Sequence, residues 1–375
     1  MLTLYDENDF HSIQFENEHE SHHLVRELMG NKSFDFVSNV NTKIIAMGYE
    51  NDIWPLTINH KEYRNALICS PYTTYVIYPL DEFKKFTKVW IKVGVLLNIV
   101  IMFVLCRLTL FNQVVQVNNN LNSLIKHPKK FIQLISEITK KIIQKYPKHA
   151  VTFFRVNDAL DNDLLNALKE YGYLVFPDRS AHVFLTKNGV MQRSHTKRDM
   201  SLLRKTSYEI VPHDALTIQD AERIAELYQS LFIEKHSRCN PQYTVYYFQQ
   251  AIQNHWHHYT ALRNTEGRID AFISWFDKEN VMTCGPLGYD SGVDRKMGLY
   301  RKLVAICLQR ADQNEIIFNM GGGSDEFKSN RGSTQTLEYT AVYCKHLPFY
   351  RQIPWKIMNY AFNKLLRKIV NDSVF

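Results

Sequence analysis

The chain has 375 residues, which exceeds the roughly 100 to 200 residues of an ordinary domain, so we expect two domains. Hydrophobic residues make up 45% of the sequence and charged residues 22%, which excludes a disordered, collagen-like or fibrous protein. The formal net charge of +7 is a mild excess that favours anionic partners such as phosphates, CoA or RNA without selecting one.

The cysteine pattern and the first twenty residues indicate the compartment. No CxxC pair occurs, and the acidic opening lacks the basic and apolar regions of a secretion or import signal. We therefore expect reduced thiols in the cytoplasm. The six cysteines are Cys69, Cys106, Cys239, Cys284, Cys307 and Cys344.

Residues 1–34 are predicted to form a polar extension ahead of an N-terminal lobe at 35–150. Within the extension, His19, Glu20 and His23 match the HExxH pattern of zinc proteases. The match lies in an acidic stretch without an evident third ligand. We interpret it as a chance match on an exposed helix and predict no metal.

The most apolar stretch of the chain is Val89 to Phe111. Only 14 residues between Lys92 and Arg107 are free of charge, and Asn98 interrupts them. Spanning a bilayer takes about 20 apolar residues. The stretch is therefore predicted to be a buried core helix rather than a transmembrane segment, and a membrane anchor is the alternative.

Around this stretch, three prolines between residues 49 and 80 favour strands and loops. Residues 128–146 carry isoleucines at helical spacing among lysines, which predicts an amphipathic helix with a basic outer face. A strand is expected after Pro147, and the domain boundary is predicted near residue 150, with the second domain at 151–375.

The second half of the chain reads as strands and helices in alternation. Thr217 and Asp220 resemble a capping box that opens a helix. Residues 267–276 and 281–290 predict a hairpin with a four-residue turn at 277–280. A helix from residue 299, buried strands at 315–320 and 337–343, and a C-terminal helix follow, the last with its inward positions at Ile357, Met358, Ala361, Leu365 and Ile369.

Three local features, together with this element order, resemble the FemAB/CelD-like branch of the GNAT superfamily over about residues 193–345. RSHTKRDMSLLRK, at Arg193 to Lys205, resembles the basic helix that opens the family's domain. RKMGLY, at Arg295 to Tyr300, resembles its donor-binding turn. GGGSDEFKSNRG, which ends at Gly332, resembles its G-x-G followed by an aromatic residue, a lysine and a glycine.

The resemblance implies an α/β fold with a mixed sheet, in which a GNAT-like acyltransferase domain accompanies a second, degenerate GNAT-like lobe at the N-terminus. It also implies N-acyltransferase activity, in which an acyl group moves from acyl-CoA or an acyl carrier protein directly onto a small-molecule amine. Family members that use aminoacyl-tRNA leave tRNA as an alternative donor. A GNAT-like module that binds without turnover is a further alternative.

The donor turn has a physical rationale of its own. A helix N-terminus presents unpaired N–H groups at its positive end, where a pyrophosphate is favoured, and Gly298 lets the backbone approach closely. Tyr300 stands where the family has Gly or Ala, and this departure favours the binding-module alternative. The candidate donor-binding residues are Arg295, Lys296, Gly298, Leu299, Tyr300 and Arg301.

In the glycine-rich stretch, Lys328 and Arg331 are expected to point toward the cleft, where a cation can stabilise an oxyanion. The resemblance makes Lys328 the first catalytic candidate, and Lys328→Ala is expected to abolish turnover without changing the melting temperature. Glu338 as base and Tyr343 as acid are competing predictions, because alternate strand residues face opposite sides. The candidate substrate contacts are Ser70, Tyr72, Asn119, Asn240, Gly322 and Arg331.

His255, His257 and His258 in HWHHY also invite a metal hypothesis. Neighbouring residues cannot share a helical face or converge from a strand, so we expect no metal site within this run.

Overall fold

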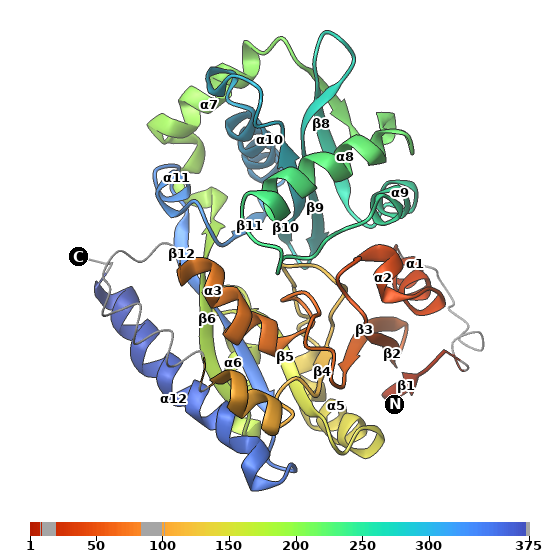
Figure 1. Cartoon of the computed structure of the whole chain (residues 1–375). Coiled ribbons are helices and arrows are strands. Elements are labelled where there is room, and N and C mark those ends of the chain that lie inside the picture. Colours follow the sequence, from red (N-terminus) through yellow and green to blue (C-terminus); the bar gives the residue numbers. More distant parts are fainter. Residues whose placement is uncertain (8, 10–19, 84–99, 101, 373–375) are drawn as a thin grey trace. The chain divides into compact units, whose positions relative to one another are not determined.

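The computed structural model describes residues 1–7, 9, 20–83, 100 and 102–372 (Figure 1). The chain divides into two compact units. Unit 1 holds Met1–Asp178, Ser237–Gln242 and Glu338–Phe375, and unit 2 holds Arg179–His236 and Tyr243–Leu337. The chain thus passes from one unit to the other several times. In the HExxH match, Glu20 and His23 lie in the helix Glu20–Gly30 and His23 is exposed, while His19 lies outside the described residues.

The strands of unit 1 form a mixed sheet. β4 and β5 pair in parallel, whereas β1 with β2, β2 with β3, β3 with β4 and β5 with β12 pair antiparallel. The boundary predicted near residue 150 falls between β4 and β5, inside unit 1. The strands are β1 (Thr3–Tyr5), β2 (Lys43–Tyr49), β3 (Asp52–Asn59), β4 (Val114–Val117), β5 (Ala150–Asn157) and, shared with unit 2, β6 (Leu174–Phe184) and β12 (Thr334–Tyr343).

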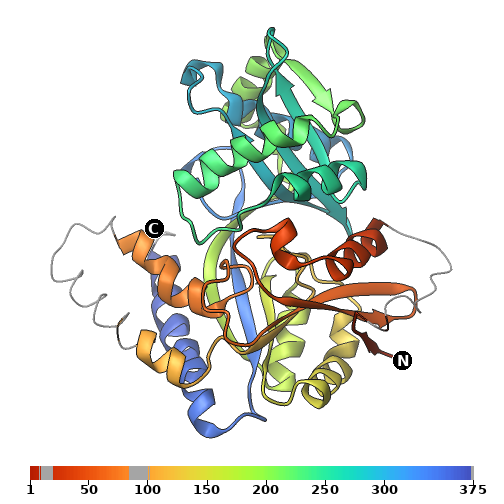
Figure 2. The same ribbon diagram turned by 45° about the vertical axis from the view of Figure 1, so that its right-hand side comes forward.

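Apolar side chains cover both faces of this sheet. Consecutive strand residues such as Ala341 and Val342 enter two different core clusters, because alternate side chains of a strand point to opposite faces. One cluster packs under α5 (Phe131–Lys145) and α6 (Asn162–Tyr171), and the other under η2 (Thr73–Ile77) and α12 (Phe349–Asp372) (Figure 2). Further helices of unit 1 are α1 (Glu20–Gly30), α2 (Ser33–Phe36) and α3 (Tyr78–Phe83).

The helix predicted at 128–146 is confirmed as α5, with Ile135, Ile138 and Ile142 buried. In α12, Met358 is buried as predicted, but the prediction for Ile357 is wrong, since its side chain is 45% exposed. Adjacent helical positions point about 100° apart, so only one of the two faces the core. The side chains of Leu365 and Ile369 lie outside the described ones.

Most of the apolar stretch at 89–111 lies outside the described residues. Residues 102–108 are helical, and Val104 is 50% and Leu108 73% exposed. The prediction of a buried helix is therefore wrong for this end of the stretch. Among the helices that the structure describes, which excludes 84–99, none has the length and apolar character to cross a membrane.

The sheet of unit 2 runs from β6 through β11 and β10 to β9, β8 and β7, with β10 and β11 parallel and the other pairs antiparallel. The predicted hairpin is confirmed. Its turn holds two residues rather than four, Glu279 and Asn280, both with positive φ (50° and 63°), as a tight hairpin turn requires. The bounds are β7 (Glu209–Pro212), β8 (His258–Arg263), β9 (Ile269–Lys278), β10 (Val281–Tyr289) and β11 (Ile317–Gly321).

Helices lie on both sides of this sheet: α8 and α9 on one, α10 with α7 on the other (Figures 1 and 2). The predicted start of α8 is confirmed by the Asp220 carboxylate, which accepts from the Thr217 backbone N–H at 2.8 Å. The bounds are α7 (Ser194–Arg204), α8 (Asp220–Tyr228), η6 (Gln229–Glu234), α9 (Val245–Gln253), α10 (Leu299–Gln313) and α11 (Asp325–Ser329). The short 3-10 turns are η3 (Thr186–Asn188), η4 (Val190–Gln192), η5 (His213–Ala215) and η7 (Arg295–Met297).

Candidate active site

The parallel strands β10 and β11 separate partway along their length. Their pairing runs from Val281↔Ile317 to Thr283↔Asn319 and ends there. Beyond that point β11 stays with β6, where Gly321 faces His182, while β10 continues along β9 past a bulge between Cys284 and Leu287. The two strand ends no longer share hydrogen bonds with each other, so the sheet opens between them. We call this place the strand fork.

The backbone conformation of the loop that follows β11 accounts for its three glycines. Gly321, Gly323 and Ser324 all have positive φ (65°, 78° and 55°), a region that glycine enters without strain. A Cβ at Gly322 would lie 2.8 Å from the backbone oxygen of Ser180. The three glycines are therefore required by the path of the chain itself.

Lys328 turns back onto this loop. Its ammonium donates to the carbonyl oxygens of Gly322 (2.8 Å), Gly321 (2.9 Å) and Met320 (3.3 Å), and the residue is only 2% exposed. An ammonium has three N–H donors, so these bonds occupy all of them. The expectation that Lys328→Ala leaves the melting temperature unchanged is therefore revised: the side chain pins the loop.

Arg331 and Arg301 share one buried carboxylate. Nε of Arg331 and Nε of Arg301 each donate to Asp199 at 2.6 Å, and Asp199 is 2% exposed. Arg331 also donates to the Phe327 carbonyl at 2.7 Å and stacks on that ring. Arg331 is consequently fixed inside unit 2, whereas the side chain of Arg301 is 41% exposed and reaches the surface.

The predicted donor turn lies at the start of α10. Gly298 has φ +61°, and a Cβ there would lie 2.6 Å from the Leu202 side chain of α7. The Asp294 carboxylate accepts from the Lys296 backbone N–H at 2.9 Å, which shapes the turn. Leu299 is buried, while Arg295 and Lys296 are exposed. The turn thus has the glycine conformation and exposed cations that an anion site needs. Its role in donor binding stays a prediction.

Tyr300 joins the donor turn to the glycine loop. Its ring packs against Phe327 with centroids 4.8 Å apart, and against Tyr289 at 5.9 Å. Burial raises the pKa of Tyr300, and a hydrogen bond with Ser324 partly offsets this rise. Tyr300, which stands where the resembled pattern has Gly or Ala, therefore fills space beside the loop with its ring.

His182 on β6 is a candidate that the sequence did not reveal. Its Nε2–H donates to Asp325 Oδ1 at 3.0 Å, and its Nδ1 accepts from the Ser333 hydroxyl at 2.9 Å. Burial, followed by the charge of Lys328, lowers the pKa of His182. The imidazole is therefore neutral near pH 7 and can take a proton from Ser333. The partners are 143 and 151 residues away in sequence, so no local motif connects them.

Glu338, predicted as the base, lies in unit 1 in a buried group that we call the arginine cluster. Arg155 donates to Asp178 at 2.9 Å, and its Nε lies 3.8 Å from the Glu338 carboxylate. Thr340 donates to Asp178 at 3.0 Å, and the Tyr75 hydroxyl donates to Thr340 at 2.8 Å. Arg155 has φ +60° where the β5–β12 register shifts, which places an unusual backbone at this cluster. Glu338 is thus an ion-paired group, and its role as base stays a prediction.

Tyr343 lies away from that cluster. Its ring packs against Tyr173 at 5.3 Å, Tyr171 at 5.7 Å and His346 at 5.9 Å. Burial raises the pKa of Tyr343. The alternation predicted for this strand therefore holds, because Glu338 and Thr340 share one environment and Tyr343 has another. The acid role of Tyr343 stays a prediction.

The predicted substrate contacts of unit 1 are engaged inside it. Ser70 donates to Asn112 at 2.8 Å, and the Tyr72 backbone N–H donates to the same oxygen at 3.1 Å. Asn119 donates to the Ile68 carbonyl at 2.8 Å. Ser70, Tyr72 and Asn119 are at most 1% exposed, so these bonds are structural, and contact with a substrate stays a prediction. Asn240 accepts from Asn39 through its backbone oxygen at 2.9 Å.

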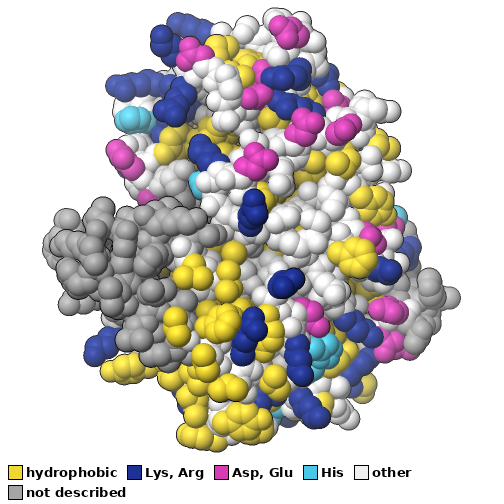
Figure 3. Space-filling model, in the orientation of Figure 1, with side chains coloured by type: hydrophobic (Ala, Val, Ile, Leu, Met, Phe, Trp, Pro, Cys, Tyr) yellow, Lys and Arg dark blue, Asp and Glu magenta, His cyan; other side chains and the backbone are white. Residues whose placement is uncertain are grey.

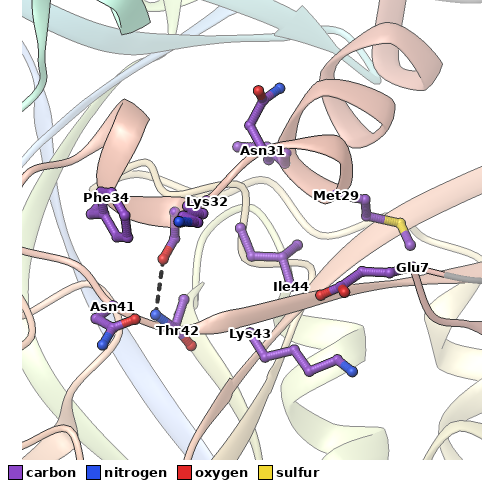
Figure 4. A pocket seen from close by; sticks show the side chains of 11 residues that line it. Glu7, Met29, Asn31, Lys32, Phe34, Asn41, Thr42, Lys43 and Ile44 are labelled. Atoms are coloured by element: carbon purple, nitrogen blue, oxygen red, sulfur yellow. Dashed lines mark hydrogen bonds between the residues drawn. The ribbon is translucent and has the colours of Figure 1, made fainter.

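Unit 1 also has a surface hollow of about 330 Å³ (Figure 4). Glu7, Lys32 and Lys43 are among its lining residues. The Ser33 hydroxyl at its edge accepts from the Thr42 backbone N–H at 2.9 Å and so holds the chain together. The strand fork carries more chemistry, since the strand beside it holds His182 and the segments that follow β10 and β11 hold two arginines and a lysine.

Comparison with known proteins supports the fold. FemX resembles this chain with a TM-score of 0.50 at 9% sequence identity, over 91% of this chain and 100% of that chain. L-PGS from Bacillus licheniformis has a TM-score of 0.46 (14% identity, 67% of this chain and 82% of that one), and a GCN5-related N-acetyltransferase from Kribbella flavida has 0.34 (12%, 63% and 84%). These two likenesses are too loose to carry an argument.

No family model matches the sequence, and no curated protein matches it. At 9% identity the likeness to FemX shows the fold alone. The mixed α/β architecture expected from the sequence is confirmed, and the fold of the chain is similar to that of FemX.

Proposed function

We propose that the chain is an N-acyltransferase that moves an acyl or aminoacyl group from an activated donor to an amine at the strand fork. The observation that supports this most is the end of β10–β11 pairing at Thr283 and Asn319, next to a helix that starts with a glycine and exposed cations. An extended acyl chain can enter where the two strands separate, while the helix start holds its phosphates.

The donor phosphates would bind at the start of α10. This helix has 15 residues, and its first backbone N–H groups form the positive end of its dipole. Arg295 and Lys296 are exposed there, and Arg301 extends from the first turn. Lys and Arg side chains also gather over the α7 edge of unit 2 (Figure 3). The exposed ones on and beside α7 are Arg193, Lys197, Arg198, Arg204 and Lys205.

In the reaction, the amine nitrogen attacks the donor carbonyl carbon, and the bond from that carbon to the leaving sulfur or oxygen breaks. The amine must lose a proton, and the leaving group must gain one. We assign the proton route to the Ser333 hydroxyl and the neutral His182, with Asp325 holding the imidazole. These three side chains form a continuous chain of hydrogen bonds.

Lys328 has a positioning role in this proposal. Its ammonium would have to leave a backbone carbonyl before it could face an oxyanion, because all three N–H groups are engaged. It keeps the end of β11 in shape instead. Oxyanion stabilisation by Lys328, as the family resemblance implies, is the alternative assignment.

Aminoacyl-tRNA is the second candidate donor. The exposed cations of α7 favour it, because phosphate contacts dominate the affinity of proteins for nucleic acids. A binding module without turnover is the remaining alternative, favoured by Tyr300 beside the glycine loop. The proposed compartment is the cytoplasm, because all six cysteines are free thiols.

The test incubates the full chain with acyl-CoA, acyl carrier protein or aminoacyl-tRNA panels and an amine mixture, and detects amide products by mass spectrometry. We expect product with one donor class. His182→Gln should lower its rate while donor binding persists, whereas His195→Gln on α7 serves as a control outside the relay. Donor binding without product would support the module, and neither binding nor product would remove the proposal.

A further inference from the structure

Away from the strand fork, unit 2 brings together His213, Asp214 and His255. The first two lie in η5, directly after β7, and His255 follows the C-terminus of α9. One potential ligand atom from each residue lies within 4.8 Å of the others, and the two imidazole rings have centroids 4.3 Å apart. We call these three residues the histidine pocket.

The backbone on both sides fixes these residues. His255 has φ +52°, a left-handed conformation that is unusual for a residue other than glycine. The Trp256 N–H donates to the Ala251 carbonyl at 3.1 Å, and Asn254 N–H to Gln250 at 2.9 Å, so the turn is tied to α9. In η5, the Leu216 N–H donates to the His213 carbonyl at 3.0 Å. The backbone segments that carry both imidazoles are therefore held in place before any ligand binds.

A hollow of about 340 Å³ opens at this pocket and is lined by all three residues together with Thr217 and Gln253. His213 is 92% buried, since only 8% of it is exposed, and its Nδ1 has no hydrogen-bond partner. A buried ring nitrogen without a hydrogen-bond partner is available as a metal ligand.

We propose that His213, Asp214 and His255 bind a divalent transition-metal ion, with Zn²⁺ as the best match. Two imidazoles and one carboxylate suit Zn²⁺, which takes four ligands. Asp214 and His255 are exposed, so the ion can enter from solvent and small side-chain movements can close the ligand set around it. Three protein ligands leave the fourth position to water or a small anion, for which the hollow has room.

Only one ligand of the proposed site, His255, comes from the HWHHY run. His255 finds its partners in η5, whereas His258 on β8 has its ring centroid 6.3 Å from that of His213. Neighbouring histidines of one strand cannot converge on one ion, but here the ligands come from two separate segments of the chain. His258 is available for comparison as a residue near the site but outside the proposed ligand set.

The test measures Zn²⁺ binding to the metal-stripped full chain, without a histidine tag, by calorimetry and by the shift in melting temperature. We expect one Zn²⁺ per chain and a higher melting temperature with the ion. His255→Asn removes the imidazole while asparagine tolerates positive φ, and Asp214→Asn removes the carboxylate. Each should weaken Zn²⁺ binding at least about tenfold.

Two controls make the result decisive. A double variant, His19→Asn with His23→Asn, should keep the binding, which separates this site from the HExxH match. His258→Gln should keep it as well. Absence of Zn²⁺ binding at micromolar concentrations would overturn the proposal. Binding that survives unchanged in both His255→Asn and Asp214→Asn, or that disappears only in the His19 and His23 variant, would also overturn it.

Discussion

Both units bury a cation, but they satisfy it in different ways. In unit 2, Lys328 is surrounded by three neutral carbonyl groups of the glycine loop. In unit 1, Arg155 lies against the carboxylates of Asp178 and Glu338. Loss of the lysine leaves unpaired carbonyls, whereas loss of the arginine leaves buried negative charge. Removing a buried cation therefore costs more stability when the partners left behind are charged than when they are neutral.

The largest effect is expected for Arg155→Met. This change leaves two buried carboxylates without their cation, and breaking such a pair costs about 3 to 5 kcal/mol of unfolding free energy. Urea unfolding at pH 7 measures it, with the exposed Arg64→Met as the matched control. A loss equal to that of the control would show that the arginine cluster is not an energetic unit.

Lys328→Met should have the next largest effect. The apolar chain keeps the volume, but three carbonyls lose a charged donor, so we expect a loss of about 2 to 3 kcal/mol. The same unfolding measurement applies, with the exposed Lys187→Met as control. An unchanged melting temperature together with abolished turnover would contradict the pinning role and restore the oxyanion assignment.

A smaller effect is expected from acid on His149 in unit 1. Burial, with a further contribution from the charge of His60, lowers the pKa of His149 to about 4. The unfolded chain therefore binds this proton first as the pH falls below about 6.5, and the folded state loses stability between that pH and about 4. Allowing for partial screening, we expect roughly 1 kcal/mol less stability from this residue at pH 5 than at pH 7.

His149→Gln checks this, because glutamine does not titrate. The difference in unfolding free energy between pH 7 and pH 5 should be smaller in the variant than in the original chain. Equal pH dependence in both proteins would mean that the histidine does not contribute to acid sensitivity.

Local patterns in the sequence predicted the regular elements well. Apolar spacing placed the helix at 128–146, and alternation with turn residues placed the hairpin of β9 and β10. These features depend on residues close in sequence. The turn of the hairpin was predicted too long, because the twist of the strands selects two residues with positive φ, which Glu279 and Asn280 supply.

The chemistry of the site depended on distant residues and was less accessible. His182 meets Asp325 and Ser333 only through the sheet, and the carbonyl partners of Lys328 depend on how the chain bends after β11. The one available signal was a histidine between apolar residues in a strand, Ala181 and Val183. Polar side chains such as Ser70 were taken for substrate contacts because burial cannot be read from sequence alone.

The central claim, that an anionic acyl donor binds at the start of α10, is tested most directly by donor affinity. Arg295→Glu with Lys296→Glu reverses two exposed charges there, and Lys148→Glu reverses an exposed charge in unit 1. Equilibrium binding of the donor class that gives product is measured for each protein. We predict at least about a tenfold loss for the double variant, equal to about 1.4 kcal/mol, no loss for the control, and unchanged melting temperatures. Equal donor affinity in all three proteins would contradict the account.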